Sequence, residues 1–264
     1  MQMSNGMNDV LNKEFTEEIW EDVNGYKLLD KIKVFIAGDS TACNYPHEGD
    51  NNRYPRTGWG QVFGEVFDGS VQVVNCALSG RSSKSFLTEP NFEYIEKNIS
   101  KGDYLIIQFG HNDCKENDQS RYTYPNGTYE ECLKRYIDAA RSKGAEPILA
   151  TSVTRNLPED ETLIPYCEAV KALGEKENIP VLDIFTLSHN QLMNEPEKHT
   201  LMYMNVEPMD KRFTGYADFK KSQYYETGDK DNTHLNIDGA RYVSRLAADE
   251  LKRLNHPLAK YLKG

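Results

Sequence analysis

The chain has 264 residues, of which 38% are hydrophobic, a formal net charge of −10 and a mean hydropathy of −0.70. This length is enough for a large core and is typical of an α/β domain. The acidic balance argues against nucleic acid as a partner, because phosphates require a basic face, and no stretch has the length and apolarity of a membrane span. The acidic net charge does not exclude a polyanionic sugar as a ligand, because local arginines can hold one.

The first ten residues are polar and lack the apolar run of a secretory signal peptide. We therefore expect a cytoplasmic protein, or a secreted one if a leader has been removed. The cysteines are odd in number, far apart and without a Cys-x-x-Cys pair, so we predict neither disulfides nor a zinc site. They are Cys43, Cys76, Cys114, Cys132 and Cys167.

Short apolar runs alternate with segments of helical periodicity along most of the chain. Residues 1–32 are predicted to form an N-terminal arm packed on a domain that spans residues 33–264. The predicted strands are 33–38, 70–75, 103–109, 146–151 and 179–184. The predicted helices are 58–67, 128–143, 164–177 and 238–254. This alternation predicts an α/β fold, a three-layer α/β/α sandwich around a five-stranded parallel sheet.

The stretch 202–230 breaks the alternation, because it is long and polar yet rich in tyrosine and phenylalanine. Two interpretations stay open. These aromatic side chains either stack on sugar rings or close a cleft as a lid, or they pack the loop onto the core.

Polar signals follow three of the predicted strands. Ser40 follows the first strand, Gly80 the second and Asn112 the third. Because the carboxyl ends of parallel strands meet at one edge of a sheet, these residues are expected to lie close together. His234, which precedes the final helix, joins them if that helix packs beside the first strand.

These residue types match the needs of nucleophilic catalysis. A serine becomes reactive when a base removes its proton and nearby donors stabilise an oxyanion. Asp231, three residues before His234, can fix the imidazole tautomer. The backbone N–H groups of Ser40 and Gly80 and the side-chain amide of Asn112 can form the oxyanion hole, with Gly80 permitting a close approach.

Each signal alone has an ordinary structural explanation. Gly-Asp-Ser is usually a turn, Asn112 alone is typical of a turn residue, and Asp-x-x-His before a helix is often a cap beside a surface histidine. His111 competes with His234 for the role of base, but it lacks a carboxylate at the Asp-x-x-His spacing. The ordered combination carries the hypothesis.

The four blocks Gly38-Asp39-Ser40-Thr41, Gly80, Gly110-His111-Asn112-Asp113 and Asp231-Asn232-Thr233-His234 resemble the signature blocks of SGNH (GDSL-type) hydrolases. Thr41, Gly58-Trp59-Gly60 and the segment 80–86 resemble rhamnogalacturonan acetylesterases more closely. The resemblance extends from about Lys33 to the final helix.

This resemblance implies a flavodoxin-like SGNH hydrolase fold and removal of O-acetyl groups from a pectic sugar chain without a metal or other cofactor. It implies that Ser40 is the nucleophile, His234 the base and Asp231 its orienting carboxylate. It also implies that Ser40, Gly80 and Asn112 supply the oxyanion hole, whereas Asp39 fixes the loop. Side chains considered for substrate contact are Arg81, Trp59 and His111, together with Arg53 and Arg56 for uronate carboxylates; Trp59 is equally typical of a core position.

The sequence thus predicts a serine carbohydrate esterase acting on acetylated pectic oligosaccharides through an acetyl-enzyme. One alternative is an SGNH esterase for acetylated xylan, a lipid or an acyl-thioester. A second is a catalytically silent sugar-binding protein, and a third, disfavoured by the lack of clustered ligands, is a metal-dependent hydrolase. No partner beyond the substrate is predicted, and the oligomeric state is left open.

Overall fold

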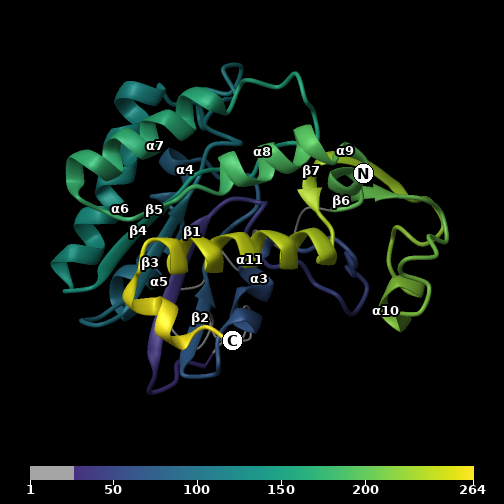
Figure 1. Ribbon diagram of the computed structural model, residues 1–264, viewed down its shortest axis with the longest axis horizontal. Coiled ribbons are helices and arrows are strands. Elements are labelled where there is room, and N and C mark those ends of the chain that lie inside the picture. The colour runs from purple at the N-terminus through teal and green to yellow at the C-terminus, as the bar shows by residue number, and fades with distance from the viewer. Residues whose placement is uncertain (1–26) are drawn as a thin grey trace.

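A five-stranded parallel sheet organises the molecule. The computed structural model describes residues 27–264, and in it the strands lie in the order β2-β1-β3-β4-β5 (Figure 1). Their bounds are β1 Ile32–Gly38, β2 Val71–Asn75, β3 Tyr104–Gln108, β4 Glu146–Ala150 and β5 Val181–Leu182. All four neighbouring pairs are parallel, which confirms the predicted sheet, although the fifth strand is shorter than predicted.

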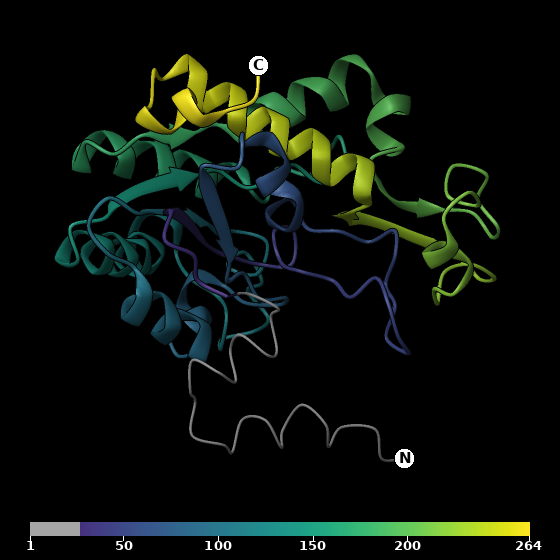
Figure 2. The ribbon, with the colours of Figure 1, turned by 90° about the horizontal axis from the view of Figure 1, so that it is seen from below.

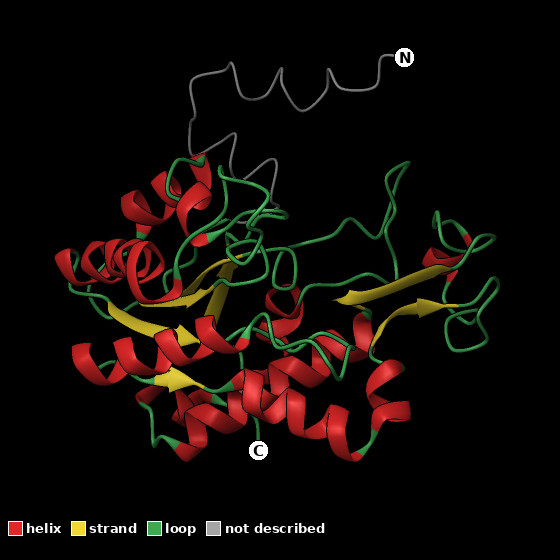
Figure 3. Ribbon diagram, turned by 90° about the horizontal axis from the view of Figure 1, so that it is seen from above, coloured by secondary structure: helices red, strands yellow, loops and turns green. Residues whose placement is uncertain are grey.

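The sheet is covered by helices on both faces, which confirms the three-layer architecture (Figures 2 and 3). Alternate side chains of β1 point into two different cores. Val34 and Ile36 belong to one core, and Phe35 and Ala37 belong to the other. A strand buried on both faces has to be apolar at every position, which explains the continuous apolar run in the sequence.

One face of the sheet packs against α5 Pro90–Asn98, α6 Glu130–Ser142 and α7 Ile164–Glu177. The other face packs against α3 Trp59–Val62, η1 Phe63–Val66, α8 Ile184–Asn194 and α11 Ile237–Arg253. The helix predicted over 58–67 is therefore two short segments. Shorter helical segments lie elsewhere in the described chain: α4 Ser83–Phe86, η2 Pro125–Tyr129, α9 Pro196–Thr200 and η3 Pro257–Tyr261.

A two-stranded antiparallel hairpin stands beside the sheet, formed by β6 Tyr203–Val206 and β7 Asp229–Leu235 (Figure 1). The insert between them, residues 207–228, contains α10 Ala217–Lys220. The sequence prediction of a long irregular loop at 202–230 is therefore wrong at both ends of the stretch.

The insert has an aromatic core of its own, made with the loop that follows β1. Phe213, Phe219 and Tyr224 are buried against Tyr54 and the hairpin residues Met204 and Val206. Of the two interpretations left open, packing holds for these three aromatic side chains, whereas Tyr216 is 52% exposed.

The N-terminal arm predicted over residues 1–32 lies largely outside the described residues. Within its described part, the Leu29 N–H donates to Gln72 Oε1 at 2.9 Å, and Gln72 Nε2 donates to Lys27 O at 2.8 Å, so this segment runs beside β2. In the part of the chain from residue 27 onward, no helix combines the length and apolarity needed to cross a membrane.

Candidate active site

Ser40 lies at the topological switch point of the sheet. It follows β1, which has β2 on one side and β3 on the other, so the connections leaving β1 and β2 run in opposite directions across the sheet. In an open parallel sheet, the crevice outside the strand ends at such a point is where ligands bind. The strand order 2-1-3-4-5 therefore places the end of β1 at the expected crevice.

Asp39 fixes the turn that presents Ser40. Its Oδ1 accepts from the Thr41 N–H at 2.9 Å and from Thr41 Oγ1 at 2.8 Å, and its Oδ2 lies 3.5 Å from His111 Nδ1. Complete burial raises the pKa of Asp39, but the contacts with His111 and Thr41 outweigh it and leave that pKa below its usual value. The carboxylate is thus occupied within the turn, as expected for a loop-fixing residue.

Asp231 and His234 form a close pair on β7. His234 Nδ1 lies 2.6 Å from Asp231 Oδ2, while Asp231 Oδ1 accepts from the backbone N–H groups of Thr233 and His234 at 2.8 and 3.1 Å. Burial raises the pKa of Asp231, but these hydrogen bonds and the charge of His234 hold it well below its usual range. The sequence located the pair before the final helix; the structure places it on a strand.

Tyr45 connects the nucleophile loop to this pair. Its hydroxyl donates to Ser40 O at 2.8 Å, and its ring lies edge-on to the His234 imidazole with 6.4 Å between centroids. Within the described residues, no hydrogen bond joins Ser40 to His234; such bonds often tighten only in the complex with substrate. Sequence reasoning did not find Tyr45, because nothing in the pattern around it signals this contact.

Gly80 and Asn112 lie on two loops that are fastened together. Asn112 Nδ2 donates to Arg81 O at 3.0 Å, and the Asp113 carboxylate accepts from the Ser83 N–H at 3.0 Å and from Ser83 Oγ at 2.5 Å. The backbone of Gly80 has φ +78°, a conformation that glycine adopts without strain. The structure therefore brings together the loops that follow β2 and β3.

The amide of Asn112 has a defined orientation. Its Oδ1 accepts from Lys115 Nζ at 2.9 Å and from Arg121 Nη1 at 3.3 Å. Ammonium and guanidinium groups only donate hydrogen bonds, so the oxygen has to face them and the NH₂ group has to face away. Among residues 27–264, Arg81 O is the one acceptor for this NH₂ group, which leaves its second hydrogen as a donor for a ligand.

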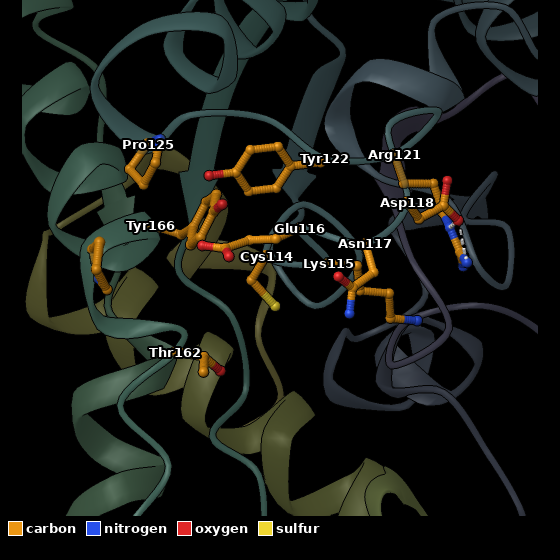
Figure 4. A pocket seen from close by; sticks show the side chains of 11 residues that line it. Cys114, Lys115, Glu116, Asn117, Asp118, Arg121, Tyr122, Pro125, Thr162 and Tyr166 are labelled. Carbon is orange, nitrogen blue, oxygen red and sulfur yellow. Dashed lines mark hydrogen bonds and ion pairs between the residues drawn. The ribbon is translucent and has the colours of Figure 1, made fainter.

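A cavity of about 810 Å³ is lined by Lys115 and Arg121, the two side chains that donate to Asn112 Oδ1, and so lies beside Asn112. Figure 4 shows Tyr122, Tyr166 and Pro125 on one side of it, and Lys115, Asp118 and Arg121 on the other. Rings and polar groups facing one space of this size are typical of small-molecule sites.

Several side chains considered for substrate contact have other roles. Trp59 is fully buried and donates to Gln108 Oε1 at 2.8 Å, so it belongs to the core and the substrate-contact prediction is wrong. His111 is 3% exposed, and its ring is turned toward Asp39. Arg81 is partly exposed but already paired with Glu89 at 2.8 Å, and Arg56 is paired with two carboxylates, which disfavours either as a uronate clamp.

Among residues 27–264, no group of three or more histidine, cysteine or acidic side chains is arranged to hold a metal ion. Every charged group described above has a partner from the chain itself. The arrangement offers a serine at a strand end, an imidazole paired with a carboxylate, and the Asn112 amide on a loop fastened to that of Gly80, which are groups that acyl transfer uses.

Comparison with known proteins places the chain in a class. The family model described as GDSL-like Lipase/Acylhydrolase matches residues 36–242. The chain therefore belongs to the GDSL-like lipase/acylhydrolase family, and it is a carboxylic ester hydrolase.

Individual relatives narrow this class toward carbohydrate acetylesterases. Rhamnogalacturonan acetylesterase RhgT of Bacillus subtilis is 38% identical over 240 residues, covering 88% of this chain and 94% of RhgT. The probable rhamnogalacturonan acetylesterase YesY of the same organism is 33% identical, covering 86% and 95%.

Solved structures share the fold. The crystal structure of Bacillus subtilis YxiM has a TM-score of 0.68 at 26% identity and covers 87% of this chain and 58% of its own. An acetylxylan esterase from Geobacillus stearothermophilus has a TM-score of 0.57 at 18% identity, covering 83% and 94%.

Proposed function

We propose that the protein is a serine acetylesterase for pectic, rhamnogalacturonan-type oligosaccharides, with Ser40 as nucleophile, His234 as base and Asp231 as orienting carboxylate. The observation that carries the proposal is the 2.6 Å contact between His234 Nδ1 and Asp231 Oδ2 in a chain whose Ser40 occupies the sheet's switch point. That contact leaves His234 Nε2 as the nitrogen available to a serine proton.

The proposed reaction has two steps. Ser40 Oγ attacks the acetyl carbonyl carbon while its proton moves to His234 Nε2, and the sugar hydroxyl leaves with that proton. Water then attacks the acetyl-serine, giving its proton to His234, and acetate leaves as Ser40 regains a proton. The oxyanion of each tetrahedral intermediate accepts from the N–H groups of Ser40 and Gly80 and from Asn112 Nδ2. Each such donor is typically worth about 3 kcal/mol.

The substrate class rests on two observations. Two relatives align with most of the chain: RhgT is named a rhamnogalacturonan acetylesterase, and YesY a probable one. The cavity beside Asn112 is lined by tyrosine rings and polar groups, and it does not have the form of a long apolar groove. Rings with polar neighbours suit a sugar better than an acyl chain, so we propose that part of the oligosaccharide occupies this cavity.

Replacing the nucleophile tests the chemistry. In Ser40→Ala we expect acetate release to fall by about 10³-fold or more, because the acyl-enzyme cannot form. Ser142→Ala is the matched control, since that hydroxyl caps the exposed end of α6 and bonds to Ala139 O. Turnover retained in Ser40→Ala would contradict the assignment.

The substrate is tested separately with acetylated rhamnogalacturonan fragments, acetylated xylan oligosaccharides and an aryl acetate. We expect the highest kcat/KM on the pectic fragments. Equal or higher kcat/KM on xylan fragments would reject the substrate class while leaving the esterase assignment in place.

A further inference from the structure

Arg56 contacts the same carboxylate oxygen that His234 uses. Its Nη2 lies 3.1 Å from Asp231 Oδ2, the atom that is 2.6 Å from His234 Nδ1, and 2.9 Å from Asp229 Oδ2. Asp229 and Asp231 are two positions apart on β7 and so point to the same side of the strand. One guanidinium nitrogen therefore bridges both carboxylates.

The backbone and the neighbouring rings hold this guanidinium in place. Arg56 pairs with Asn236 in an antiparallel bridge at the end of β7, and the next residue, Thr57, donates from its N–H to Leu235 O at 3.0 Å. The guanidinium carbon lies 5.9 Å from the Tyr45 ring centroid and 5.5 Å from that of Tyr224. Because the side chain is only 16% exposed, solvent screens its charge weakly.

A cation on Asp231 Oδ2 changes what that carboxylate does for His234. A carboxylate stabilises an imidazolium through its negative charge, and a second cation on the same oxygen takes up part of that charge. Arg56 and a protonated His234 are also like charges that face one atom. The bridge therefore fixes the carboxylate in position and at the same time weakens its pull on the proton of His234.

We propose that Arg56 is a positioning residue that orients Asp231 toward His234 and reduces the negative charge that Asp231 presents to the imidazole. This inference rests on the proposed function of His234 as base. It assigns to the loop between β1 and α3 a part in the chemistry that the four sequence blocks do not contain.

Other ionisable groups also face this cluster. Burial raises the pKa of Tyr45 above its ordinary value and that of Cys43 to about 12, so both stay protonated in the relevant range. His47 Nε2 lies 3.0 Å from Arg56 O and has to be followed separately. Ionisable groups from three elements face Arg56 or the Asp231–His234 pair. β7 contributes Asp229, the insert contributes Tyr224, and the loop after β1 contributes Cys43, Tyr45 and His47.

The test is the titration of His234 in the full-length protein, followed by NMR of its imidazole, together with the pH dependence of kcat/KM on an aryl acetate. In Arg56→Met we expect the His234 midpoint and the acid limb of kcat/KM to move up by about 0.5 to 2 pH units. Following the imidazole signals of His47 and His234 separately assigns the shift to one ring.

Two further variants guard against a folding defect in Arg56→Met. Asp229→Asn removes a negative charge and leaves Arg56 with Asp231 alone. The titration midpoint of His234 and the acid limb of kcat/KM should therefore move to lower pH. Arg56→Lys keeps the charge, so it should hold the limb near the wild-type position while kcat falls. Arg241→Met is the matched control, because Arg241 on α11 pairs with Glu65 of η1, away from Asp231, and the substitution should leave the acid limb of kcat/KM unchanged.

If Arg56 has a purely structural role, Arg56→Met lowers the plateau of kcat/KM while its acid limb does not move or moves down, and this result overturns the proposal. An unshifted acid limb in Asp229→Asn also contradicts it. Different results would contradict the role of Arg56 and the proposed function. If wild type hydrolyses acetate esters but the NMR midpoint does not move, only the role of Arg56 is lost. If the midpoint moves but wild type and His234→Ala are equally active, the proposed function is lost instead.

Discussion

At the scale of single residues, Asp113 joins the two loops that carry the proposed oxyanion donors. It is fully buried and accepts from Ser83, the first residue of α4 after the loop of Gly80, and from Thr123 Oγ1 at 2.9 Å. Burial raises the pKa of Asp113 to about 7, although these hydrogen bonds oppose the rise. The carboxyl group therefore titrates within the range in which the enzyme is handled.

This raised pKa has a defined effect on stability. A carboxyl group whose folded pKa lies above its unfolded value stabilises the fold fully below about pH 4, and this contribution is lost as the pH rises toward 7. Relative to Asp113→Asn, the free energy of unfolding of wild type should fall by on the order of 2 to 4 kcal/mol between pH 4.5 and 7.5. Urea unfolding of both proteins across this window measures the difference.

Asp118→Asn is the control for this comparison. Asp118 lies near the surface, and hydrogen bonds with Ser120 and Arg121 lower its pKa to about 2, so its contribution is constant between pH 4.5 and 7.5. If wild type and Asp113→Asn show parallel pH profiles, Asp113 does not titrate in this window.

At the scale of elements, the start of α3 packs directly on the backbone of the nucleophile loop. The Trp59 N–H donates to Thr41 O at 2.9 Å, and a Cβ added to Gly58 would collide with the backbone of Ala42 and Cys43. The absence of a side chain at Gly58 therefore sets how closely α3 approaches the loop of Ser40.

Gly58→Ala should consequently destabilise the protein by about 2 kcal/mol or more and lower kcat, because backbone atoms have to move to admit the methyl group. Gly64→Ala is the matched control in the adjoining η1, where nothing lies within 4 Å of the added Cβ. Its effect on thermal unfolding should stay within about 0.5 kcal/mol of wild type. Equal effects of the two substitutions would contradict the role of close approach.

Whether an element could be predicted from the sequence depends on how local its signal is. The strands of the parallel sheet were predictable because both faces are buried and each run is apolar throughout. β7 was missed because Asp229–Leu235 reads Asp-Lys-Asp-Asn-Thr-His-Leu, with none of the apolar or β-branched enrichment that marks a strand. It pairs with β6, whose residues Met204 and Val206 pack in the aromatic core that the intervening insert forms with Tyr54, a residue distant in sequence.

At the scale of the whole molecule, two sides of the site offer different surfaces to a long substrate. One side is the cavity beside Asn112, whose lining includes Lys115, Arg121, Tyr122 and Tyr166. The other is the hairpin with its packed insert, which Figure 1 shows at the opposite end of the molecule from α6 and α7. The proposed substrate occupies the first side.

Tyr122→Ala tests this direction, because Tyr122 lines the cavity but makes none of the contacts of the proposed triad. We expect KM for acetylated oligosaccharides to rise several-fold through loss of ring stacking, with kcat/KM for an aryl acetate unchanged. Tyr216→Ala, an exposed tyrosine on the insert, is the control and should leave both substrates unaffected. The reverse pattern would place the sugar chain along the insert.

By itself, the sequence determined the class of fold, the family and the residues proposed for the chemistry. These are local properties: apolar runs mark buried strands, and short motifs mark strand ends where polar groups converge. Only the tertiary structure decided the surroundings of those residues. The partners of Arg56 are 173 and 175 positions away in the chain, and Trp59 proved to be core because α3 closes on the sheet. Contacts between distant segments leave no periodic trace in a single sequence, so the environment that tunes His234 appears only when the chain is folded.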